Sequence, residues 1–251
     1  MSSVLQFLSI HVGQRWMRMG LSFVAVSLAA GCTSVKPLDS AQADAIKNVG
    51  VISLLPTSVV YQKIGITVFN NERVEKPVAS ALNDAARAGA ESALKSMNRN
   101  VKLLDVNFSE VKALFKPGPI VFSWPPEKAK AFLVDLAKEN NLDAVCVVHE
   151  VFDADNGYAG VRYFLRGDFN GIGRHGISTD TSTELYDAKG NILKSSASGI
   201  NAMFSVERPD GKYWTSKIDD SLDPATQEKV LSSMKKIIEN KTATQVQALG
   251  L

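Results

Sequence analysis

The residue whose surroundings point most clearly to chemistry is Cys32, a thiol at the end of an apolar N-terminal segment. Two arginines, Arg15 and Arg18, precede an apolar run from Leu21 to Ala30, which ends in small residues next to the cysteine. A positive region, a short apolar region and small residues at a cleavage site are typical of a secretory signal peptide. The run is shorter than the roughly 20 residues of a membrane-spanning helix. We therefore expect cleavage at this point and no transmembrane anchor.

The residues around Cys32 also indicate a lipid modification. The segment 28–32, with sequence LAAGC, resembles the lipobox of bacterial lipoproteins, although Ala29 stands where that family usually has leucine. The resemblance implies that Cys32 receives a diacylglycerol and that the chain is cut after Gly31. Two or more acyl chains anchor a protein stably, since each buried methylene contributes about 0.8 kcal/mol. Thr33 follows the cysteine, and in the enterobacterial sorting pattern this implies the periplasmic face of the outer membrane.

This interpretation divides the chain into a signal peptide, a polar tether that starts at the lipidated cysteine, and one folded domain, at residues 1–31, 32–47 and 48–251. The first 14 residues contain no lysine or arginine, so the translation start is Met1, Met17 or Met19. Removal of the signal peptide leaves 26 basic and 26 acidic residues. Binding to nucleic acid requires a clustered positive field, and this neutral balance argues against such a partner.

Two histidines of the folded domain are candidates for chemistry. His149 is followed by Glu150, as in the helical motif of zinc proteases, but Asp153 stands where that motif needs its second histidine. The stretch also has the pattern of a strand, so we expect an ordinary histidine at a strand end and no metal site. His175 lies beside Arg174 in a glycine-rich turn, which either binds an anion through charge and backbone donors or is a plain hairpin crossing. The sequence predicts no cofactor and identifies no catalytic residue.

The second cysteine, Cys146, lies in the apolar run 144–148. A small apolar side chain packs well in such a strand, whereas a reactive thiol needs a cationic and partly exposed setting. We therefore expect Cys146 to be a buried structural residue.

Hydrophobic periodicity predicts the elements that must position these residues. Strands are expected at 49–55, 59–69, 101–106, 144–151, 160–170, 177–186, 192–198 and 201–206. Helices are expected at 41–46, 76–98, 109–115, 127–140 and 223–248. This order predicts an α+β fold, in which helices pack on one side of a mixed, mostly antiparallel sheet.

The strand at 160–170 alternates between apolar and charged residues and offers a candidate binding surface. We expect a flat sheet face that carries basic and aromatic side chains: Tyr61, Arg162, Phe164 and Arg166, with Arg174 and His175 in the turn that follows.

Three segments and the closing helix resemble a family of envelope lipoproteins with an α/β domain. The segments are KNVGVISLLP, AKAFLVDLAKENNLDAVCVVHEV and STELYDAKGNILKSSASG. The family includes the curli-secretion lipoproteins and the outer-membrane activators of penicillin-binding proteins, with the N-terminal domain of the Tol-system propeller protein as a relative. The resemblance implies a binding or assembly-accessory role without a catalytic site. Pore formation is not implied, because no pair of long hairpins shows the lipid-facing alternation of a barrel.

These patterns together predict a lipid-anchored, non-catalytic domain in the periplasm that binds another envelope protein. Two alternatives are open. One is a periplasmic hydrolase whose site assembles from distant residues around His149 or His175, and the other is a structural spacer with no specific ligand.

Overall fold

The structure is a computed structural model, and it describes residues 38–65, 71–115, 125–151, 160–166, 174–196, 206–207 and 223–251. The predicted signal peptide and Cys32 lie outside the described residues, as does most of the expected strand at 201–206.

The described elements are five helices and ten strands. The helices are α2 (Ser40–Ala45), α3 (Ala81–Ser96), α4 (Phe108–Leu114), α5 (Glu127–Asn140) and α6 (Pro224–Gln247). The prediction for α5 is confirmed at both ends. That for α6 is confirmed at its start, where the Asp223 carboxylate accepts a hydrogen bond from the backbone N–H of Thr226 at 3.0 Å and caps the helix.

The strands form two five-stranded sheets. The first sheet has the order β4 (Asn100–Leu103), β1 (Asn48–Leu54), β5 (Ala144–Glu150), β8 (Thr181–Asp187) and β9 (Ile192–Ser195). The second sheet has the order β10 (Val206–Glu207), β7 (Arg174–Thr179), β6 (Val161–Arg166), β2 (Ser58–Ile64) and β3 (Glu72–Pro77). Strand β1 is parallel to β4 and β5, and β2 is parallel to β6, while the other described pairs are antiparallel. The predicted α+β class with mixed sheets is therefore confirmed.

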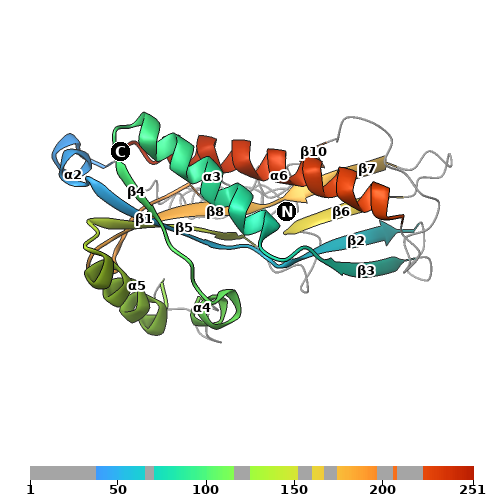
Figure 1. The fold of residues 1–251 in the computed structure, drawn as a ribbon, viewed down its shortest axis with the longest axis horizontal. Helices are drawn as coiled ribbons and strands as arrows, with labels where there is room; N and C mark the ends of the chain where they lie inside the picture. Colours follow the sequence, from blue (N-terminus) through green and yellow to red (C-terminus); the bar gives the residue numbers. More distant parts are fainter. Residues whose placement is uncertain are drawn as a thin grey trace, which may run out of the picture. The chain divides into compact units, whose positions relative to one another are not determined.

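The first sheet continues into the second through two short breaks (Figure 1). Strands β1 and β2 are separated by residues 55–57, and β7 and β8 are separated by Asp180 alone. The backbone N–H of Val151 donates to the carbonyl of Asp180 at 2.9 Å, so hydrogen bonding carries on across the second break. The sequence predicted one strand over residues 177–186, and the structure divides it at Asp180.

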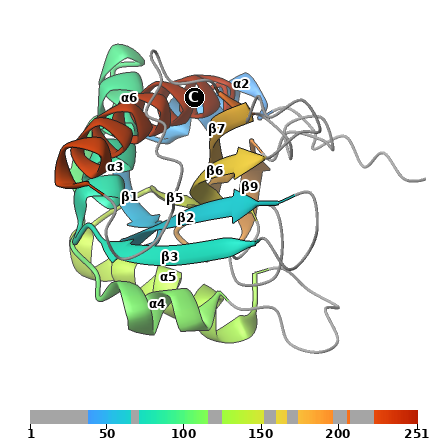
Figure 2. The ribbon, with the colours of Figure 1, turned by 90° about the vertical axis from the view of Figure 1, so that its right-hand side faces the viewer.

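Helices cover both faces of the first sheet, which differs from the expected packing on one side (Figures 1 and 2). Alternate strand residues point to opposite faces. Val51 packs with α3 and α6 on one face, whereas Ile52 packs with α4 and α5 on the other. Both faces are apolar for this reason, and the central strand β5 is buried at its first five residues.

The predicted helix over 76–98 begins later than expected, because residues 72–77 form strand β3 and not a first helical turn. Pro77 disfavours a helical conformation at the residue before it and lies at the end of the strand. The burial of β3 alternates residue by residue, which is the period of a strand with one covered face.

Helices α3 and α6 approach each other closely at Gly89. A methyl group built on Gly89 would overlap the backbone carbonyl of Glu239 in α6. The two helices bury a shared apolar cluster against the second sheet, which includes Leu82, Ala86, Met234 and Ile238. Glycine is therefore required at position 89 because the two helices lie too close for a side chain there, and not because of its backbone conformation.

Replacement of Gly89 by alanine is expected to destabilise the fold, because the overlap with the Glu239 backbone adds an overpacking cost of up to about 3 kcal/mol. Helix propensity alone predicts the opposite sign, a gain of about 1 kcal/mol. Urea unfolding of the full-length chain measures the difference, with Ser92→Ala at an exposed site of the same helix as the control. Equal stability of the Gly89→Ala variant and the wild type would contradict the close approach.

Candidate functional site

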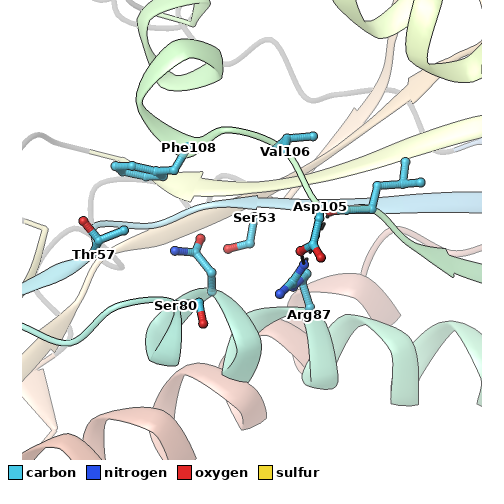
Figure 3. A pocket seen from close by; sticks show the side chains of 9 residues that line it. Ser53, Thr57, Ser80, Arg87, Asp105, Val106 and Phe108 are labelled. Atoms are coloured by element: carbon cyan, nitrogen blue, oxygen red, sulfur yellow. Dashed lines mark hydrogen bonds and ion pairs between the residues drawn. The ribbon is translucent and has the colours of Figure 1, made fainter.

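Two adjoining pockets lie where β1, β4 and β5 reach their carboxyl ends. Ligands of open α/β sheets commonly bind at this edge of parallel strands. The first pocket has a volume of about 110 Å³, and the second has a volume of about 200 Å³. Thr57 and Phe108 line both of them. Figure 3 shows the first pocket between α3, the end of β1 and the connection from β4 to α4.

Asn83 lines the first pocket and forms hydrogen bonds to the backbone directly after β1. Its side-chain oxygen accepts a hydrogen bond from the backbone N–H of Leu55, and its side-chain nitrogen donates to the carbonyl of the same residue, both at 2.9 Å. Asn83 is only 7% exposed. A buried amide that satisfies both backbone groups of one residue fixes the direction in which the chain leaves the strand.

Arg87 is the cation that lines the first pocket. Its guanidinium donates to the carboxylates of Asp84 and Asp105, and the Ser80 hydroxyl donates to Asp84 at 2.7 Å. The hydrogen bond from Ser80 and then that from Arg87 lower the pKa of Asp84 below its usual value of 3.8. The three charged groups are therefore paired with one another within the chain.

Ser53 points into the first pocket from β1 (Figure 3). The residue is 6% exposed, and its hydroxyl has no hydrogen-bond partner among the described residues. A buried polar atom without a partner is costly. Its position beside Arg87 and Asn83 makes this hydroxyl available to a polar group that enters the pocket.

The second pocket carries both signs of charge, with Arg73 and Lys112 as cations and Glu75 and Glu150 as anions. Lys112 Nζ lies 3.3 Å from Glu150 Oε2, and Glu150 Oε1 accepts a hydrogen bond from the backbone N–H of Val161 at 3.0 Å. Glu150 thereby connects the end of β5 to the start of β6. A cavity lined in this way suits polar ligand groups of either sign.

A chain of polar side chains extends from His149 across the first sheet. His149 Nε2 lies 3.4 Å from Glu184 Oε2, and the Tyr186 hydroxyl donates to the same carboxylate. His149 Nδ1 lies 2.8 Å from the carbonyl of Glu150 and donates to it when the imidazole is charged. Burial alone would lower the pKa of His149, but the hydrogen bond and charge of Glu184 outweigh burial and raise it above 6.5. The expected strand conformation at His149 is confirmed.

The predicted binding surface does not form as one exposed face. Tyr61 is 1% exposed and packs beside Tyr163 on the face covered by α3 and α6, where burial and then Tyr163 raise its pKa to about 12. Arg162 and Phe164 point to the opposite face by strand alternation. Arg162 is 2% exposed, and its Nη1 donates to the side-chain oxygen of Gln62 at 3.0 Å. Tyr61 thus lies on the face opposite Arg162 and Phe164, because the register between neighbouring strands was not available from the sequence.

The remaining predicted surface residues meet at the end of the second sheet. Arg166 pairs with Arg174, and Leu165 pairs with His175, in the antiparallel ladder of β6 and β7. The structure therefore brings these backbone positions together and places them in strands, where the sequence suggested a turn at His175. Their side chains lie outside the description, and so does the anion site predicted there.

No family model matches this chain, and no curated protein matches it. The resemblance to envelope lipoproteins therefore stays a prediction based on the quoted segments. Among the described residues, no helix is both long and apolar enough to cross a membrane. Nor does this part of the chain group three or more metal-ligating side chains.

Cys146 is fully buried, and burial raises the pKa of its thiol to about 12, so the structural role predicted for it is confirmed.

The sequence interpretation missed the residues that line the first pocket. Asn83 interrupts the alanine-rich buried stripe of α3, and Arg87 lies partly buried beside that stripe; this interruption was the available signal. Ser53 gave a weaker signal as a polar residue within an apolar strand. Nothing in the sequence indicated that Asp105, from the connection after β4, would meet Arg87.

Replacement of His149 by glutamine tests the paired imidazole. Because the folded state raises the pKa of His149, its pairing with Glu184 stabilises the protein fully below pH 6.5, and this contribution is lost as the pH rises through the folded pKa. The free energy of unfolding should therefore differ between wild type and variant more at pH 5.5 than at pH 8.5. Urea unfolding at both pH values measures this difference.

Lys95→Gln, which removes an exposed cation on α3, is the matched control and should show no such pH dependence. A difference for His149→Gln that stays constant or grows with pH would show that His149 is not charged through Glu184.

Proposed function

We propose that this chain is a lipid-anchored envelope protein whose folded domain binds another envelope protein at the two adjoining pockets without catalysing a reaction. The observation that supports a binding role is the arrangement of the charged side chains in and next to the pockets. Arg87 is held between Asp84 and Asp105, and Lys112 is paired with Glu150. Charges that are already fixed in pairs are preorganised for recognition, which reduces the entropy lost on binding.

The proposed anchor would keep this site near the membrane. Helix α2 begins at Ser40, so seven residues lie between Cys32 and the first described element. A fully extended chain of this length spans about 25 Å. The predicted tether of residues 32–47 is thereby shortened, since α2 occupies residues 40–45 of it.

The chemistry of the two pockets favours a polypeptide partner with charges of both signs. The first pocket offers an arginine, an exposed carboxylate and a buried hydroxyl, and the second offers two cations and two carboxylates. Phe108 lies between them and supplies an apolar contact. A surface that combines a central aromatic residue with polar groups around it is typical of protein interfaces.

One observation favours the alternative of a hydrolase. His149 is paired with Glu184, and Ser182 lies directly opposite His149 in the ladder of β5 and β8. Ser182, however, is only 2% exposed, and the Glu184 carboxylate is also bound by Tyr186. A buried serine is poorly placed to attack a substrate, so the binding role is the better supported of the two.

Mass spectrometry of the protein isolated from membranes tests the anchor. We expect a chain that begins at residue 32 and carries a diacylglycerol on Cys32. The Cys32→Ala variant should carry no acyl mass, because the thiol is the acceptor of the lipid. A wild-type chain that keeps residues 1–31, or that has an unmodified Cys32, would contradict the proposed address.

Photo-crosslinking in cells tests the binding site. A benzophenone amino acid at Phe108 of the full-length chain should form an adduct with an envelope protein, and the same probe at Phe132 should not. Phe132 is a partly buried aromatic residue on α5 and serves as the matched position. Thr57→Trp, which adds bulk where the two pockets meet, should lower the yield of the Phe108 adduct at least about tenfold, because it fills the shared wall.

An adduct that forms equally at Phe108 and Phe132, or that is insensitive to Thr57→Trp, would contradict a partner at the pockets. Labelling of the wild type by a serine-directed fluorophosphonate, with loss of the label in Ser182→Ala, would instead establish the hydrolase.

A further inference from the structure

Strand β3 forms an outer edge of the second sheet (Figure 2). Among the described strands it pairs with β2 alone. Its sequence is Glu72-Arg73-Val74-Glu75-Lys76-Pro77, and the odd-numbered residues are exposed while the even-numbered residues are partly buried. An edge strand presents backbone hydrogen-bonding groups to any chain that can pair with it.

The hydrogen bonds to β2 show which backbone groups of β3 point outward. The N–H of Val78 donates to the carbonyl of Thr57 at 2.9 Å, so residue 78 faces β2. Because the direction alternates along an antiparallel strand, residues 74 and 76 also face β2, whereas Arg73, Glu75 and Pro77 face outward. Proline, which has no N–H, is tolerated in a sheet where its nitrogen faces away from the neighbouring strand.

We propose that β3 pairs antiparallel with β3 of a second copy of this chain, about a two-fold axis at Val74. In this register Arg73 of one copy faces Glu75 of the other, and these are the residues whose backbone groups point outward. Each such pair exchanges two backbone hydrogen bonds, and the two-fold axis repeats the pair. The second sheets of the two copies then form one continuous sheet.

Charge selects this register over its neighbours. With the axis at Val74, Glu72 faces Lys76 of the other copy, Arg73 faces Glu75, and Val74 faces itself. Moving the axis by one residue places Arg73 opposite Arg73 or Glu75 opposite Glu75, and like charges directly opposite each other destabilise a sheet. A closed two-fold contact of this kind is self-complementary, as the interface of a homodimer must be.

Charged residues on an edge strand often prevent pairing with other chains. In β3 the positive and negative residues are arranged so that opposite charges face each other when two copies pair. The charges therefore do not prevent pairing with a second copy, but they still disfavour pairing with strands of other sequence. The side chains already have contacts within the chain, such as Lys63 Nζ with Glu72 Oε1 at 2.7 Å and the Ser58 hydroxyl with Glu75. The inference depends on the outward backbone groups and on the order of charges. Arg73 and Glu75 also line the second pocket, so a second copy on β3 and a partner in that pocket would share these two side chains.

Disulfide crosslinking of the full-length chain in membranes tests the pairing. Val74→Cys places two thiols on the two-fold axis at a non-hydrogen-bonded pair, where cross-strand side chains approach most closely. Mild oxidation with copper phenanthroline should give a reducible species of about twice the monomer mass. Cys146 is fully buried and Cys32 carries the proposed lipid, so neither thiol competes. Leu103→Cys, on the exposed edge strand β4, is the control for random collision and should give about tenfold less of this species.

Charge reversal provides a second test, whose outcome can be distinguished from a loss of crosslinking caused by misfolding. In the Val74→Cys background, Arg73→Glu alone and Glu75→Arg alone should each lower the crosslink about tenfold, because each places like charges opposite each other twice. Mixing the two variants, with tags of different size, should restore the crosslink as a heterodimer, because every facing pair is then of opposite sign.

Three results would overturn the proposal. They are a Val74→Cys yield no higher than that of Leu103→Cys, a yield that ignores both charge reversals, and an adduct that contains a different protein in place of a second copy.

Discussion

The buried amide of Asn83 decides how this chain passes from one sheet to the next. It satisfies both backbone groups of Leu55, the residue at which the pairing of β1 with its neighbours ends. Without such a partner the chain would have two unpaired polar groups in an apolar core, which costs free energy comparable to lost hydrogen bonds. Because the break is held in this way, β2 can pair with β3 and β6 while β1 pairs with β4 and β5. The pockets arise at the same place, since two sheets diverge there between the first turns of α3 and α4.

A second polar array supports the other side of the junction. Ser178, Asp180, Ser182 and Glu184 alternate along β7 and β8, and each is at most 6% exposed. Burial raises the pKa of Asp180, although the Ser178 hydroxyl donates to it at 2.9 Å. Buried polar groups specify one arrangement of a core at some cost in stability. These polar residues thus lie at the junction where the first sheet passes into the second, and apolar residues form the core of each sheet away from that junction.

The sequence was sufficient to predict the elements whose apolar residues recur at a regular spacing because one side of the element is buried. Helix α5, the start of α6 and the buried strand β5 follow directly from apolar spacing and capping residues. It was insufficient where distant strands decide the outcome. Tyr61 and Phe164 belong to strands that pair, yet their opposite parities place them on opposite faces, and no local pattern states the register. Lys76 and Pro77 at the end of β3 were taken for the start of a helix, because six residues with four charges carry little periodic signal until β2 covers one side of them. The first pocket was missed for the same reason, because Arg87 and Asp105 meet only when α3 and the end of β4 are packed together.

The seven residues between Cys32 and α2 have a consequence for how strongly any partner must bind. If the thiol carries its lipid, the domain explores only a shell a few nanometres deep above one leaflet, together with every other protein held in that leaflet. Confinement of this kind raises the effective concentration of neighbouring sites to the order of millimolar for short linkers. Contacts too weak to be detected between freely diffusing molecules would then be well populated at the membrane surface. A small edge strand and two shallow pockets are sufficient recognition elements under that constraint.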